Sequence, residues 1–118
     1  MTTATVRVER HDNVPVVYVQ GEIDIVNASQ VGGQLLDAAP NDAPGVVVDL
    51  SNVTYLDSRG LHLLFELAER LRIRDQRLQI VVPPRALIRR VLLLTHLDSV
   101  VSLSASVQEA VQQMMPAR

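Results

Sequence analysis

The sequence contains no cysteine and no lysine. Without cysteine the chain can form no disulfide, no thiolate metal site and no cysteine nucleophile. Its three histidines are scattered, and no glycine-rich phosphate loop is present. Metal and nucleotide sites depend on such groupings, so we expect neither a metal nor a cofactor.

Long apolar runs are also missing. Residues 1–10 lack the apolar core of a signal peptide, and no later run approaches the length that a membrane-spanning helix needs. We therefore expect a cytoplasmic protein that does not enter a membrane.

The formal net charge of −2 gives no general attraction to nucleic acid or to an anionic membrane. The one basic cluster, Arg70, Arg72, Arg74 and Arg77, falls at the end of a predicted helix, where cations complement the helix dipole. Because the chain has only 3% aromatic residues, direct nucleic-acid binding is a minor alternative.

A chain of 118 residues with 47% hydrophobic content can bury one core and has no room for a second domain. We therefore expect a single domain over residues 1–118. A monomer is the default expectation for its oligomeric state.

The first half of the chain predicts a hairpin followed by a helix. Residues 5–9 alternate in polarity, residues 11–13 favour a turn, and residues 14–19 form a second strand. Pro15 places the first residues of that strand at an edge or outside the ladder. Residues 21–27 are predicted to form a loop with two acids, and a helix capped near Asn27 should end before Pro40.

The second half alternates strands and helices. The uninterrupted valines at 46–48, closed by Asp49, are typical of a strand buried on both faces. We predict further strands at 78–82 and 100–101, and helices from Asp57 or Ser58 to about Arg74, around 87–92, and at about 107–115. Ser106 and Glu109 have capping-box spacing. This order predicts an α/β domain whose mixed sheet opens with an N-terminal hairpin and carries about four helices.

The junction between the valine strand and the next helix holds the strongest motif. Asp57 and Ser58 both favour the N-cap position, and the residues behind them are apolar at helical spacing. Ser58 is therefore predicted to lie at the positive end of a helix dipole.

The stretch from Val47 to Leu61 resembles the signature of the STAS family, which includes bacterial anti-sigma factor antagonists and the tails of sulphate transporters. Residues 21–24 resemble the first loop of that family, and residues 91–98 resemble its later helix and turn. The resemblance runs from about residue 5 to about residue 114.

The resemblance implies a STAS-like fold and a non-enzymatic role in transcription regulation, as in a stress response. It implies an anti-sigma factor antagonist that works by partner switching. The unphosphorylated form binds an anti-sigma factor that is itself a serine kinase, and this binding releases the sigma factor. Phosphorylation of the serine after the aspartate, here Ser58, ends the binding, and a phosphatase restores it. The implied partner-binding residues are Asp24, Asn27, Asp57, Ser58, Arg59, Gly60 and His62.

A bare Ser58 lets a partner pack over it without burying a net charge, whereas phosphorylation adds a charge of about −1.5 to −2. Arg59 would partly neutralise that phosphate. Taken without the resemblance, Asp57 and Ser58 are simply a helix cap. Asp24 has two readings, as a loop cap or as an acid near the phosphorylation site. Gly60 either eases packing or admits a partner backbone.

Other function classes fit less well. A nucleophile elbow needs a glycine two residues before Ser58, where Leu56 stands. His62 is more typical of a solvated histidine than of a base, and Asp49 of a hydrogen-bonding acid than of a phosphoacceptor. The alternative function is an accessory STAS subunit of a membrane transporter complex, which needs no phosphorylation.

Overall fold

A five-stranded sheet forms the centre of the molecule, and the computed structural model describes residues 3–115 of the chain. The strands are adjacent in chain order: β1 (Ala4–His11), β2 (Val14–Ile23), β3 (Gly45–Leu56), β4 (Arg77–Val81) and β5 (Ser102–Ser104). The β1–β2 hairpin is antiparallel and the remaining pairs are parallel, so the sheet is mixed as predicted.

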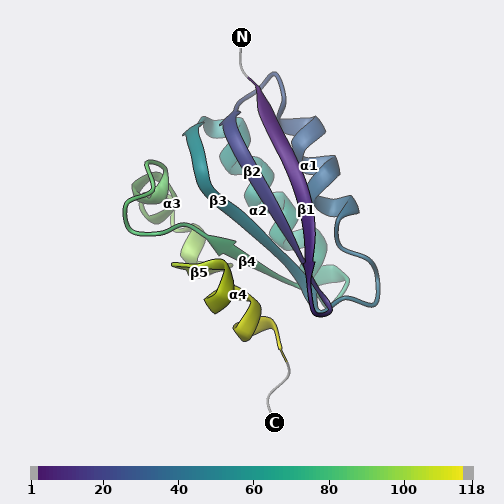
Figure 1. Cartoon of the computed structure of the whole chain (residues 1–118). Helices are drawn as coiled ribbons and strands as arrows, with labels where there is room; N and C mark the ends of the chain where they lie inside the picture. The colour runs from purple at the N-terminus through teal and green to yellow at the C-terminus, as the bar shows by residue number, and fades with distance from the viewer. Residues whose placement is uncertain (1–2, 116–118) are drawn as a thin grey trace.

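Four α-helices and one short 3₁₀ helix cover the sheet. They are α1 (Ala28–Asp37), α2 (Ser58–Ile73), α3 (Arg89–Leu94), η1 (Leu97–Ser99) and α4 (Val107–Met114). In Figure 1, α1 and α2 lie behind the strands. Among residues 3–115 no helix combines the length and the apolar character needed to cross a bilayer.

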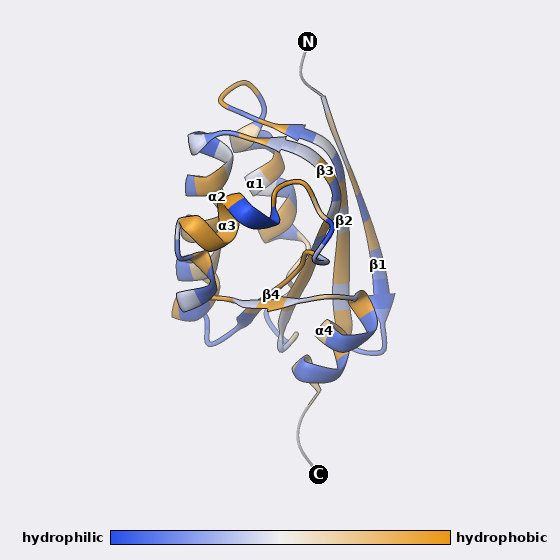
Figure 2. Cartoon of the chain, turned by 90° about the vertical axis from the view of Figure 1, so that its left-hand side faces the viewer, coloured by the Kyte–Doolittle hydropathy of each residue, from blue (hydrophilic) through white to orange (hydrophobic). Residues whose placement is uncertain are grey.

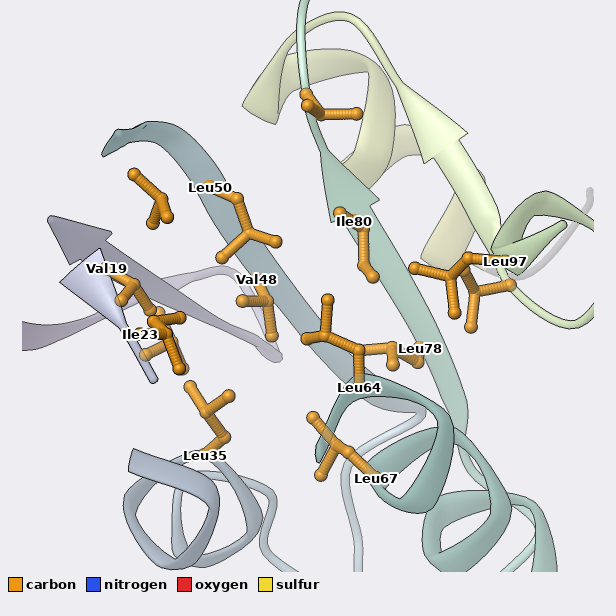
Figure 3. Packing of buried hydrophobic residues seen from close by; sticks show 14 of the residues in the cluster. Val19, Ile23, Leu35, Val48, Leu50, Leu64, Leu67, Leu78, Ile80 and Leu97 are labelled. Atoms are coloured by element: carbon orange, nitrogen blue, oxygen red, sulfur yellow. The ribbon is translucent and has the colours of Figure 1, made fainter. Parts of the chain in front are cut away.

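Hydrophobic residues are buried on both faces of the sheet. The larger cluster joins Val46, Val48 and Leu50 of β3 to α1 and α2, and Figure 3 shows Leu35 and Leu64 pointing from these helices towards the strands. A smaller cluster joins Val47 to α4. Because side chains alternate along a strand, the valine run supplies both clusters, as its pattern predicts.

Strand ends differ most from the predictions. Residues 21–23 belong to β2 rather than to a loop, and β3 continues past Asp49 to Leu56, because the parallel β2–β3 register continues to Ile23 and Leu56. The last strand lies at Ser102–Ser104, not at residues 100–101. The N–H groups of Val100 and Val101 instead donate to the carbonyl of Leu97 in a turn.

Other local predictions are confirmed. Pro15 precedes the first β2–β3 pair at Val16, so its missing N–H leaves no bond of that ladder unmade. The first helix ends at Asp37, before Pro40. Its N-cap is Asn27, but the Asn27 side chain makes no capping hydrogen bond. Ser106 caps α4 by accepting from the backbone N–H of Glu109.

Candidate functional site

The predicted site lies where β2 and β3 end together. Ile23 pairs with Leu56 in the last register position of these parallel strands. The loop after β2 and the start of α2 after β3 therefore meet at one edge of the sheet, as the carboxyl ends of parallel strands do. This topology brings Asp24 and Asn27 to the same region as Asp57 and Ser58.

Asp57, not Ser58, caps α2. One carboxylate oxygen, Oδ1, accepts from the backbone N–H of Arg59 at 2.9 Å and of Gly60 at 3.0 Å. The other, Oδ2, accepts from the backbone N–H of Ile25 at 3.1 Å. One side chain thus satisfies the helix start and ties it to the loop after β2.

Ser58 is the first residue of α2 and is exposed. Within the described part of the chain, its hydroxyl makes no hydrogen bond to another residue, because Asp57 already serves the first turn of the helix. The hydroxyl is therefore free to meet a second molecule at the positive end of the helix dipole.

The loop between β2 and α1 is braced by its own polar groups. Asn27 donates from Nδ2 to the carbonyl of Glu22 at 2.8 Å, and its Oδ1 accepts from the N–H of Asp24 at 3.0 Å. Asp24 in turn accepts from the N–H of Val26 at 2.9 Å. Asp24 therefore acts in the loop as a cap, which is one of the two readings of its sequence position.

Two aliphatic side chains of this loop are exposed to solvent. Ile25 is 67% exposed and Val26 is 79% exposed. Sequence reasoning gave neither residue a role. The available signal was a pair of β-branched aliphatics inside a predicted polar loop, where exposure of apolar groups is unfavourable unless a partner covers them.

A groove of about 330 Å³ continues from this loop between α1 and α2. Ile25, Arg59 and His62 line the end nearest Ser58, and Gly32 and Gly33 line the α1 side. The exposed His62 lies 3.3 Å from Glu66, which also approaches Arg70 at 3.8 Å. The groove thus combines apolar surface with charged groups of both signs.

The seven predicted partner-binding residues are all found at this edge, but they are not equally exposed. Ser58, Arg59 and His62 are on the surface. Asn27 and Gly60 are buried, so they shape the loop and the helix start rather than present side chains. Their part in partner binding stays a prediction.

The side chains considered above for phosphoacceptor, base or metal-binding roles make other contacts in the structure. Asp49 accepts hydrogen bonds from the backbone N–H and the hydroxyl of Ser51, which is a structural use of the acid. His62 contacts Glu66 and not Ser58. Residues 3–115 contain no group of three or more His, Asp or Glu side chains placed to hold a metal ion.

Arginines of the basic cluster make separate contacts within the chain, with Arg72 in α2, Arg74 at its C-cap and Arg77 at the start of β4. Arg72 donates to Glu69 at 2.6 and 3.0 Å, which lowers the pKa of the Glu69 carboxyl and raises the pKa of the Arg72 guanidinium. Arg74 donates to the Asn41 side chain, and Arg77 donates to the carbonyl of Met114.

The chain is similar in sequence to a known domain family and to a known protein. A family model described as the STAS domain matches residues 5–110. The chain is 33% identical over 67 residues to an anti-sigma-F factor antagonist, RsfB, of Mycobacterium tuberculosis, a match that spans 57% of this chain and 55% of that relative's length. The aligned part thus covers about half of the relative.

Two solved structures are similar over almost the whole chain. An anti-sigma factor antagonist from Mycobacterium paratuberculosis is 34% identical, with a TM-score of 0.84 over 95% of this chain and 94% of that one. The Bacillus cell fate determinant SpoIIAA in its phosphorylated form is 18% identical, with a TM-score of 0.68 over 94% of this chain and 100% of that one. The second likeness concerns the fold alone.

Proposed function

Because the chain belongs to the STAS domain family, we propose that it is an anti-sigma factor antagonist switched by phosphorylation of Ser58. In its unphosphorylated form it binds an anti-sigma factor serine kinase in the cytoplasm, so that the sigma factor is released. Phosphorylation of Ser58 ends this binding, and a phosphatase reverses it. The protein itself performs no catalysis and contacts no DNA.

One observation carries the proposal. An exposed serine with a free hydroxyl begins α2, directly beside an apolar loop whose Ile25 and Val26 lie in water. Because the Ile25 N–H donates to Asp57, the residue before Ser58, a partner that covers the loop comes close to Ser58. The switch therefore needs no change of fold, because the phosphate acts within the contact surface.

The charges around Ser58 favour a strong effect of phosphorylation on partner affinity. Phosphorylation adds about −1.5 to −2 charges next to the Asp57 carboxylate and the apolar loop. The backbone N–H groups of Arg59 and Gly60 are already bonded to Asp57 and are not free to receive the phosphate. Arg59 is the adjacent cation and reduces the repulsion in part. A charge buried unpaired at an interface costs about 2–5 kcal/mol, or roughly thirty-fold to several-thousand-fold in affinity.

The test is calorimetric titration of the cognate anti-sigma kinase with three variants. Ser58→Ala should bind like the unmodified protein, and Ser58→Glu should bind at least about thirty-fold more weakly, because it brings a fixed charge to the interface. Ser102→Glu is the matched control, since Ser102 is an exposed serine on β5, away from the α2 start. It should bind normally.

Incubation with the kinase and ATP, followed by mass spectrometry, should find one phosphate on the peptide that contains Ser58 and none in Ser58→Ala. Equal binding by Ser58→Glu and the unmodified protein would reject the switch. That result, together with an unmodified Ser58, would favour the accessory subunit of a transporter complex.

A further inference from the structure

The outer edge of β1 is a long strand edge without a partner in the described part of the chain. β1 is the outermost strand of the sheet (Figure 1), and its eight residues pair with β2 without a break from Ala4 to His11. The opposite edge, β5, has only three residues. A long, regular edge without proline or a bulge can accept another strand.

The position of Pro15 fixes which backbone groups point outward. In an antiparallel pair, hydrogen-bonded and non-hydrogen-bonded positions alternate. Pro15 has no N–H and pairs with Arg10, so this must be a non-hydrogen-bonded position. By alternation, the N–H and carbonyl groups of Arg10, Val8, Val6 and Ala4 face away from β2 and are available at the edge.

The charges on β1 then select one register for a second copy. A two-fold pairing of identical edges is antiparallel, and it must match outward-facing residues with each other. Centring the pair on Arg7 or on Glu9 places a residue opposite its own copy, which opposes like charges. Centring it on Val8 places Arg7 opposite Glu9 of the second copy, twice, and Val8 opposite Val8.

The side chains are placed for such a contact. Arg7 contacts Glu9 along the strand and lies over the Tyr18 ring, 4.4 Å from its centroid. Both charged side chains are exposed, so they can reach across the edge. Val8 is 52% exposed on the other face of the strand, and pairing would cover it.

We propose that the protein forms a two-fold dimer through β1, in antiparallel register centred on Val8, which joins two five-stranded sheets into one. Charges on an edge strand commonly prevent association. Here the two opposite charges complement each other, because the Val8-centred register is the one that places Arg7 opposite Glu9. This dimer differs from the monomer that we take as the default state in the sequence analysis.

The dimer is independent of the proposed switch. β2 separates β1 from β3, and Val8 pairs with Val17, which in turn pairs with Val48, eight positions before Leu56 at the end of β3. Each copy keeps its own Ser58. Loss of dimerisation would therefore leave the switch intact, and loss of the switch would leave the dimer intact.

Sedimentation equilibrium of the whole chain tests the association. The mean mass should rise with concentration and stop at two copies, because a two-fold contact closes on itself. A mass of one chain at every concentration up to about 1 mM, where even a millimolar dissociation constant gives substantial association, would overturn the proposal. Growth beyond two copies would also overturn it.

Charge reversal tests the register. Arg7→Glu and Glu9→Arg should each weaken dimerisation by about tenfold, because each converts two opposite-charge pairs into like-charge pairs. The double variant Arg7→Glu/Glu9→Arg restores the pairs and should dimerise like the unmodified protein. A double variant that stays as weak as the single ones would reject the Val8-centred register. Circular dichroism should show that all three variants keep the fold.

Cross-linking gives a direct readout, since the chain has no cysteine of its own. Val8→Cys should be joined into a covalent dimer by a short bismaleimide, because the two Val8 residues face each other. Leu94→Cys is the control, since Leu94 is 67% exposed on α3, outside the proposed contact. Equal yields from the two variants would contradict the proposed contact.

Discussion

At the start of α2, Gly60 allows the helix to pass directly over the end of β2. A Cβ atom at this position would lie 2.5 Å from Cδ1 of Leu56 and 3.1 Å from both Cγ2 and the carbonyl oxygen of Ile23. The contact to the Ile23 backbone cannot be relieved by turning a side chain. Gly60 is therefore required by packing within the chain, which is one of the two readings that its sequence position allows.

Gly60→Ala should lower the free energy of unfolding by about 1–3 kcal/mol, since overpacking outweighs the better helix propensity of alanine. Gly33→Ala in α1 is the matched control, because nothing lies within 4 Å of its added Cβ. That variant should gain about 0.5–1 kcal/mol. Urea unfolding measures both. A Gly60→Ala protein as stable as the unmodified one would contradict the close approach.

The residues around Ser58 fall into two groups, those that hydrogen-bond within the chain and those that are exposed. Asp57 and Asn27 use their polar atoms on backbone groups of the chain. Ser58, Ile25 and Val26 are exposed to solvent. The buried or bonded residues thus build the surface, and the exposed ones are free to meet a partner.

The helices α2 and α4 begin with similar N-caps, but the two capping side chains differ in what else they contact. Asp57 and Ser106 each have extended backbone at the N-cap and each accepts from the first turn of its helix. Only Asp57 also holds a distant segment, through the N–H of Ile25. The Asp57 side chain therefore links the start of α2 to the loop that carries Ile25.

Asp57→Ala should lower the free energy of unfolding by about 1–2 kcal/mol, through loss of the cap and of the bond to the loop. It should also speed hydrogen exchange at the Ile25 amide, which loses its acceptor. Ser106→Ala serves as the comparison: it should cost about 0.5–1 kcal/mol and leave the Ile25 amide unchanged. Unaltered Ile25 exchange in Asp57→Ala would argue against the tie between loop and helix.

At the scale of the whole molecule, the two hydrophobic clusters stabilise the sheet from opposite faces. The larger one lies under α1 and α2, and the smaller one under α4. In Figure 2 the apolar residues, in orange, run along the strands and recur on the helices beside them. The short C-terminal helix is therefore part of the core rather than an appendage.

The neighbouring methionines of the C-terminal segment test this role. Met114 is 1% exposed in the smaller cluster, whereas Met115 is 43% exposed. Met114→Ala should cost about 2–4 kcal/mol of unfolding free energy because it leaves a cavity. Met115→Ala should change stability by less than about 0.5 kcal/mol. Chemical unfolding followed by two probes measures both, and equal effects would show that α4 contributes little to the core.

Features that depend on neighbouring residues were predicted correctly from the sequence. The Ser106 cap, the end of α1 before Pro40 and the double burial of the valine strand all follow from backbone chemistry or side-chain alternation over a few residues. The motif around Asp57 and Ser58 was likewise recognisable, because its residues are consecutive.

The tertiary structure alone decided the features that depend on pairing. The ends of β2 and β3 and the position of β5 are set by hydrogen bonds to strands distant in sequence, which no local pattern specifies. The same holds for the bond from Asp57 to Ile25 across 32 positions and for the exposure of Ile25 and Val26. The sequence alone thus allowed us to predict Asp57 and Ser58 as site residues, but not Ile25 and Val26. Only the fold determined which of them face water, because exposure depends on what the rest of the chain packs against.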